Sequence, residues 1–187
     1  MDAYLFSTFL AEDLVTSLIC EDKLISLEIK NSVKKIYEND LEGLEMSLNF
    51  RSAVFNLMAE ECSTVRSYCR DFLYVYRKGI TISDFNSFAT DTALKFFKEG
   101  YSPALFIAYC AVIIELAILC HERNLDNVFE QAIGLISTIL IAHVLVYQST
   151  GGEKAVFASL AKQASRFNKG LEKFNRAKRK IYITTKL

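Results

Sequence analysis

The sequence has little of what interrupts a helix, with one proline and seven glycines among its 187 residues. Apolar residues recur at spacings of three and four in almost every window, and the strict alternation that is typical of strands is nearly absent. The sequence therefore predicts an all-α fold, a bundle of about seven or eight helices joined by short connections. We expect these helices near residues 3–20, 22–38, 41–59, 61–77, 84–99, 103–123, 126–148 and 154–180.

The chain also lacks net charge, histidine and catalytic motifs. Its 22 Lys and Arg residues balance 22 Asp and Glu residues, so charge indicates neither a nucleic-acid partner nor an anionic membrane. Two histidines are too few for a multi-histidine metal centre. No Gly-rich phosphate loop, H-E-x-x-H or G-x-S-x-G motif occurs in the sequence. We therefore expect a protein that is not an enzyme and that binds neither metal nor nucleic acid.

Cysteine is present in an odd number and without C-x-x-C spacing. The five residues are Cys20, Cys62, Cys69, Cys110 and Cys120. Four of them lie in apolar helical patterns, which indicates reduced and mostly buried thiols rather than disulfides. The N-terminus has no basic stretch, and acidic residues interrupt its apolar positions, so it does not resemble a signal peptide. These features predict a cytoplasmic protein.

Two segments are more apolar than an exposed helix. The segment from Pro103 to Cys120 carries one formal charge, Glu115, and the segment from Ala132 to Gln148 carries none. A helix that is apolar all round is buried, either by protein or by lipid. Because both runs are slightly short of the roughly 20 apolar residues needed to span a bilayer, or contain polar side chains, we favour a buried hairpin over a membrane hairpin.

The C-terminal segment has a different composition. Residues 153–187 carry mostly Lys and Arg charges, and their Phe and Leu residues keep helical spacing. This pattern predicts a basic amphipathic helix that packs on the domain formed by residues 1–152 or on a partner. The alternative is an outer helix face that only contacts solvent.

The stretch "LKFFKEGYSPALFIAYCAVIIELAIL" resembles the second half of a bacterial sensor globin. Lys98, Gly100 and Pro103 match the basic residue, the glycine and the proline that precede a long apolar helix in that family. The later run "ISTILIAHVLVYQ" resembles the final globin helix. Phe96 occupies the position of the haem-ligating histidine, and a phenylalanine ring cannot ligate iron. The segment therefore resembles the non-haem globin domains of bacterial stress and sensor proteins, or the stand-alone sensor globins that hold a fatty acid.

This resemblance implies a haem-free sensor or regulatory protein that acts through protein–protein contacts and holds an apolar ligand, such as a fatty acid, in place of a cofactor. The residues expected around the ligand are Phe96, Phe97, Tyr101, Phe106, Tyr109 and His143. The resemblance also implies a homodimer joined by a four-helix bundle. Its expected interface residues are Ile113, Leu116, Ile136, Leu140, His143 and Tyr147. A signalling partner would contact the basic C-terminal helix.

Two other functions stay open. One is a structural or host-interaction helical protein without a ligand. The other is a bilin- or haem-binding protein, because "CRDFLYVYRKG" resembles the C-x-R-D stretch of phycobiliproteins, although Cys69 lies out of register with the cysteine that binds bilin in that family.

Overall fold

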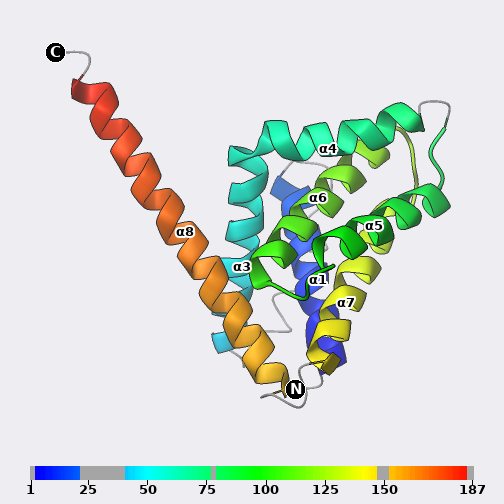
Figure 1. Cartoon of the computed structure of the whole chain (residues 1–187), viewed down its shortest axis with the longest axis horizontal. Helices are drawn as coiled ribbons and strands as arrows, with labels where there is room; N and C mark the ends of the chain where they lie inside the picture. Colours follow the sequence, from blue (N-terminus) through cyan, green and yellow to red (C-terminus); the bar gives the residue numbers. More distant parts are fainter. Residues whose placement is uncertain (1–2, 22–40, 77–78, 147–151, 185–187) are drawn as a thin grey trace.

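The computed structural model describes residues 3–21, 41–76, 79–146 and 152–184. These residues form seven helices and, within those ranges, no strand (Figure 1). The helices are α1 (Ala3–Glu21), α3 (Leu41–Glu60), α4 (Cys62–Val75), α5 (Ile82–Phe96), α6 (Pro103–His121), α7 (Val128–Val146) and α8 (Gly152–Thr184). The prediction of an all-α bundle of seven or eight helices is confirmed. The helix expected at 22–38 lies outside the described residues.

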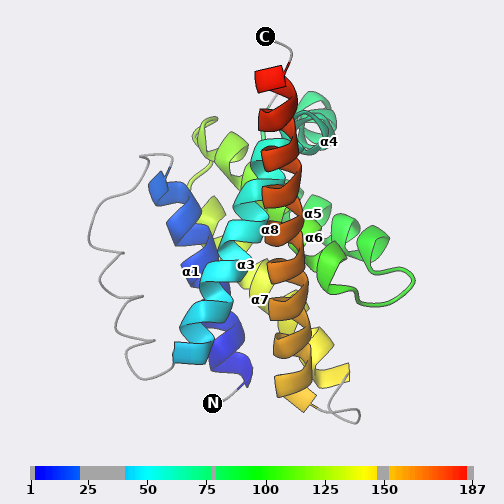
Figure 2. The same ribbon diagram turned by 90° about the vertical axis from the view of Figure 1, so that its left-hand side faces the viewer.

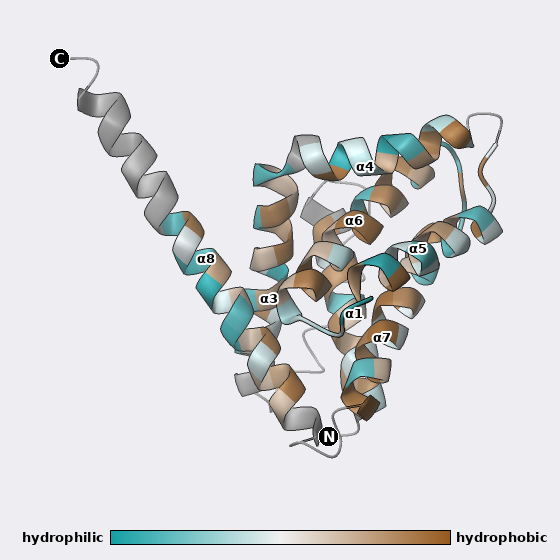
Figure 3. Ribbon diagram, in the orientation of Figure 1, coloured by the Kyte–Doolittle hydropathy of each residue, from teal (hydrophilic) through white to brown (hydrophobic). Residues whose placement is uncertain are grey.

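Helix α6 is the centre of the fold, and α3, α4, α5, α7 and α8 all pack on it (Figures 1 and 2). Thirteen of its 19 residues are buried, including all of those from Phe106 to Cys120 except Ala108 and Leu119. Figure 3 shows the apolar character of α6 and of its neighbour α7. By length and composition both helices could also span a membrane. However, 72% of the apolar stretch of α6 is buried inside the protein, compared with 39% of the apolar stretch of α7. Burial by protein therefore explains the apolar composition of α6.

The ends of α5 and α6 follow local sequence rules. Thr81 caps α5, because its hydroxyl accepts a hydrogen bond from the Asp84 backbone N–H at 3.2 Å and its own N–H donates to the Asp84 carboxylate at 2.9 Å. The helix expected from residue 84 therefore begins two residues earlier, at Ile82. Gly100 has a φ of 107° in the turn after α5, and Pro103 is the first residue of α6, as the sequence indicated.

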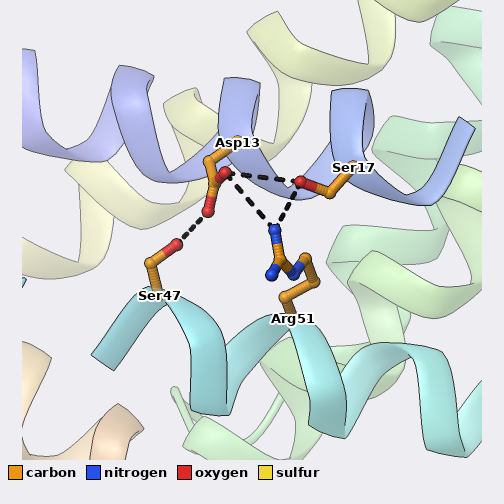
Figure 4. A network of polar contacts seen from close by, with 4 residues as sticks. All are labelled: Asp13, Ser17, Ser47 and Arg51. Atoms are coloured by element: carbon orange, nitrogen blue, oxygen red, sulfur yellow. Dashed lines mark hydrogen bonds and ion pairs between the residues drawn. The ribbon is translucent and has the colours of Figure 1, made fainter. Parts of the chain in front are cut away.

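Helices α1 and α3 run parallel and share a buried polar network (Figure 4). Asp13 is 5% exposed, and its carboxylate accepts hydrogen bonds from Ser47 on α3 and from Ser17 at 3.4 Å. Arg51 donates to Ser17 at 2.7 Å and lies 3.8 Å from the Asp13 carboxylate. Since both hydrogen bonds between the helices join residues 34 apart in sequence, this network fixes the register of α1 against α3.

The first part of α8 belongs to the same core as the rest of the chain. Val156, Phe157, Leu160 and Ala164 are buried, and α8 packs on α3, α6 and α7. Asn168 extends this contact by donating to the Asn49 carbonyl oxygen at 3.0 Å. Up to this residue the C-terminal helix therefore packs on its own domain.

Candidate functional site

Five of the six residues expected around a ligand come together where α5 ends, α6 begins and α7 ends. The His143 ring lies 4.2 Å from the Tyr101 ring and 4.9 Å from the Phe97 ring, centroid to centroid. Phe97 also lies 5.8 Å from Tyr109, and Tyr101 lies 6.0 Å from Phe106. We call these five residues the aromatic–histidine cluster. The turn at Gly100 brings the cluster together, because it folds the end of α5 back onto the start of α6.

The cluster is apolar and electrically neutral. Tyr109 is fully buried, and its hydroxyl has no hydrogen-bond partner among the described residues. Burial raises the pKa of Tyr109, with a smaller contribution from the neighbouring Cys110. Burial also lowers the pKa of His143, which favours the neutral imidazole. A ligand that separated these rings would find an apolar lining and one unused hydroxyl donor, which suits a hydrocarbon chain with a single acceptor group.

The other expected site residues lie elsewhere. Phe96 is next to Phe97 in sequence, but its ring contacts α4, 6.4 Å from the ring of Tyr68. The buried residues among the expected dimer interface are Ile113, Leu116, Ile136 and Leu140, all at most 1% exposed. Since they fill the core of a single chain, a dimer that used them would first have to open that core. Tyr147 lies outside the described residues.

A second aromatic group, which sequence reasoning missed, lies between α4 and α5. Its ring contacts are Tyr68–Phe88 at 5.6 Å, Phe72–Phe88 at 4.7 Å, Phe72–Tyr76 at 4.6 Å and Tyr68–Phe96 at 6.4 Å. We call these five residues the α4–α5 seam. The four-residue spacing of Tyr68, Phe72 and Tyr76 is the sequence signal that could have predicted one side of it.

The seam is apolar but open to solvent. Phe72 is 4% exposed, whereas the other four rings are half-buried. Helices α4 and α5 each pack on α6, but they are not among the closely packed helix pairs of the described residues. Side-chain rings, rather than close backbone packing, therefore join the two helices.

An ion pair in which only the carboxylate is buried lies on another side of α4. Glu115 on α6 is 6% exposed and accepts a hydrogen bond from Nε of Arg66 at 2.7 Å. Burial raises the pKa of the nearby Cys69 thiol to about 12, with further contributions from Glu115 and Cys120. Burial also raises the pKa of Cys120 to about 11, although Arg123 opposes this shift. With raised pKa values these buried thiols favour the protonated form near neutral pH, which is typical of packing residues. Arg66 pairs with Glu115.

A shallow open depression of about 630 Å³ lies along α5, apart from the cluster and the seam. It is lined by Ile82, Ser83, Asn86, Ser87, Thr90 and Asp91. All of these residues come from one helix, and the depression has no second wall that would enclose a ligand.

The two histidines lie at separate places in the fold. The described residues contain no group of three or more His, Cys, Asp or Glu side chains that could hold a metal ion. His121, at the end of α6, packs on the ring of Phe129 at 4.9 Å, whereas His143 belongs to the aromatic–histidine cluster.

No protein-family model matches the chain, and neither the curated proteins nor the solved structures include a match. The resemblances to non-haem sensor globins and to phycobiliproteins remain predictions.

Proposed function

We propose that this protein is a helical regulatory protein that acts through protein–protein contacts, and that it binds an amphipathic helix of its partner along the α4–α5 seam. The observation that carries this proposal is the strip of half-buried aromatic rings between two helices whose backbones are not closely packed. The proposal keeps the regulatory role expected from the sequence and adds a contact surface.

The chemistry of the seam suits a helical partner. Aromatic side chains offer a large apolar area and are enriched at binding hot spots. Their contacts with one another hold the rings in place before binding, which lowers the entropy cost of association. Tyr68, Phe72 and Tyr76 are spaced four residues apart, which is about 6 Å along α4 and its C-cap. An amphipathic helix presents its apolar anchors at the same interval, so the two surfaces match in spacing.

The experiment selects binders from a displayed library of amphipathic helical peptides and measures their affinity by fluorescence anisotropy. Replacing a half-buried ring of the seam in Tyr68→Lys should weaken binding by about tenfold or more, since hot-spot residues commonly contribute that much. Tyr74→Lys is the matched control, because Tyr74 is on the same helix and 72% exposed. The pair Phe88→Lys and Leu94→Lys repeats the comparison on α5, where Leu94 is 68% exposed. Equal effects of the seam and control substitutions would contradict the proposal.

A second candidate function is favoured by the aromatic–histidine cluster. Rings from three elements converge there, and the buried Tyr109 hydroxyl has no hydrogen-bond partner among the described residues. This fits an apolar ligand such as a fatty acid whose carboxylate or ester oxygen accepts from that hydroxyl. Binding would separate the rings and shift the packing of α5 against α7. Native mass spectrometry of purified protein should then show an added mass that unfolding releases. Tyr109→Phe should weaken retention of this ligand, and an absorption band of haem or bilin would contradict the candidate.

The C-terminal helix needs its own test as a partner-binding segment. Since Val156 and Ala164 are buried, deletion of all of residues 153–187 would expose the core. A truncation after Glu172 keeps the described buried part of α8. Loss of partner binding in this variant, with unchanged thermal stability, would assign the contact to the basic end of the helix.

A further inference from the structure

The basic residues of α8 recur along one side of the helix. Lys162, Arg166 and Lys169 are exposed, and they are separated by the four and three residues that keep them on one helix face. The sequence continues this basic row along the α8 backbone with Lys173, Arg176 and Lys180. A row of cations on one side of a helix indicates an anionic surface as its partner.

The opposite side of α8 carries an apolar row. Leu160 and Ala164 are buried, and Phe167 is half-buried against the core. The sequence continues this apolar row with Leu171, Phe174 and Ile181. The two rows are offset by two residues, which places them about 200° apart around the helix axis. Lys178 interrupts the apolar row, but lysine is a residue type whose stem can lie along an apolar surface while its charge reaches water.

Both rows continue where α8 leaves the rest of the bundle. Asn168 still contacts α3, and Figure 1 shows the last part of α8 running away from the other helices. The 16 residues from 169 to 184 form about 24 Å of this helix. An isolated helix of this length is marginal in water. A surface that accepts both the apolar row and the basic row would therefore stabilise it.

We infer that the projecting end of α8, residues 169–184, binds the surface of a bilayer that contains anionic lipids. The helix lies in the plane of the interface, with its apolar row toward the acyl chains and its basic row toward the headgroup phosphates. The inference goes beyond the proposed function and does not rest on it, because it uses no residue of the α4–α5 seam. It would hold the protein at a membrane while the seam contacts a partner.

The distribution of charge along the chain selects an anionic surface. Residues 173–187 carry six Lys and Arg residues and no Asp or Glu. Because the whole chain has a net charge of zero, residues 1–172 carry a net charge of minus six. The balance of charge therefore conceals a basic end on an acidic body. Clusters of about four to eight basic residues on an amphipathic helix are typical of segments that bind anionic lipid.

The apolar row distinguishes lipid from other anionic surfaces. A nucleic acid offers phosphates, but no hydrocarbon layer beside them for the apolar row. A bilayer with anionic lipid offers both, because its headgroups lie directly over its acyl chains. A second copy of the protein offers acidic residues instead, and this occupant predicts self-association without lipid.

The test measures binding of the full-length protein to large unilamellar vesicles by flotation. One set of vesicles is phosphatidylcholine alone, and the other contains about 30% phosphatidylserine, both at roughly 0.1 M salt. We expect the affinity for the anionic vesicles to exceed that for the neutral vesicles by about a hundredfold or more. It should fall about tenfold or more at roughly 0.5 M salt, because salt screens the basic row.

A charge variant and a matched control separate the basic row from charge in general. The charge variant is Lys173→Gln/Arg176→Gln/Lys180→Gln. It should lower the affinity for the anionic vesicles about a hundredfold, since each basic residue near the surface contributes roughly fivefold. The control removes the same charge from exposed residues of the body and should leave binding unchanged. It is Arg70→Gln/Lys95→Gln/Lys98→Gln.

An apolar variant, Phe174→Gln/Ile181→Gln, separates lipid from other anionic partners. It should weaken binding to the anionic vesicles about tenfold or more, because the helix can no longer bury its apolar row. Glutamine is a good helix former, and all five substituted residues of α8 follow Ala164, the last buried residue of the described part of this helix. Thermal unfolding of both α8 variants should therefore match that of the wild type.

Three results would overturn the inference. The first is equal binding to neutral and anionic vesicles, or equal losses in the charge variant and its control. The second is binding to a double-stranded DNA oligonucleotide that is tighter than binding to the anionic vesicles and that the apolar variant leaves unchanged, which would favour nucleic acid. The third is absence of vesicle binding together with self-association in light scattering that the charge variant removes, which would favour a second copy.

Discussion

The ion pair between Arg66 and Glu115 predicts that two substitutions in one contact have opposite consequences for stability. Glu115 is the only charged residue between Pro103 and Cys120, and its side chain is 8% exposed. Arg66 is 52% exposed, so water reaches one partner and hardly the other. Arg66→Ala would leave a buried carboxylate without its cation. Glu115→Leu would remove the buried charge and place a strong helix former of similar size in an apolar environment.

The magnitudes follow from this difference in exposure. Breaking a fully buried pair from one side costs about 3–5 kcal/mol, and the exposure of Arg66 reduces this to about 2–3 kcal/mol for Arg66→Ala. Glu115→Leu should lie within about 1 kcal/mol of the wild type or be more stable, because apolar replacement of a buried pair is often neutral or favourable. In the Glu115→Leu background, Arg66→Ala should cost less than about 1 kcal/mol, because the remaining interactions of an exposed arginine contribute little to stability.

Urea unfolding at pH 7, followed by far-UV circular dichroism, gives the four free energies of this double-mutant cycle. Thermal unfolding should show Arg66→Ala roughly 5–10 °C below the wild type, given the size of the chain. Arg70→Ala, an exposed arginine one turn further along α4, is the control and should change little. A loss above about 2 kcal/mol in Glu115→Leu, or no loss in Arg66→Ala, would refute the reasoning from burial.

Three further predictions concern titration, thiol reactivity and helix capping. Burial lowers the pKa of His143 in the folded protein, so on acidification the unfolded chain takes up a proton before the folded chain does. The free energy of unfolding should therefore fall as the pH drops below about 6.5. His143→Gln should reduce this fall, as urea titrations between pH 7 and 5.5 can check. Cys69, Cys110 and Cys120 are buried with raised pKa values, so iodoacetamide at pH 8 should label their peptides far faster in urea than in the native protein, as peptide mass spectrometry can check. Thr81→Ala should cost about 1 kcal/mol in urea unfolding by removing the cap of α5, whereas Thr81→Ser should keep most of it.

The helices and their ends were largely predictable, since helix formation depends on residues that are near in sequence. The spacing of apolar residues indicated six of the seven described helices to within two or three residues at each end, and Gly100 and Pro103 marked the turn between α5 and α6. The start of α5 was misplaced by two residues because Thr81 and Asp84 form a reciprocal cap, in which Asp84 is the third helical residue rather than the first.

The site was predictable only in part. The residues of the aromatic–histidine cluster could be expected together because Phe97, Tyr101, Phe106 and Tyr109 lie close in sequence, across one turn. The seam could not, because Tyr68 and Phe88 come from separate helices whose relative placement depends on how each packs on α6.

By itself the sequence determined that the chain is helical, where its turns lie, and that the helix from Pro103 is buried, since an apolar helix with one charge has to leave water. Only the tertiary structure decided what each helix face contacts. Phe96 and Phe97 are neighbours in sequence but project in different directions around the end of α5, so one ring joins α4 and the other joins α7. Glu115 likewise pairs with a cation, Arg66, that lies 49 residues away in sequence. Such pairings depend on how the helices pack together, which local spacing does not encode.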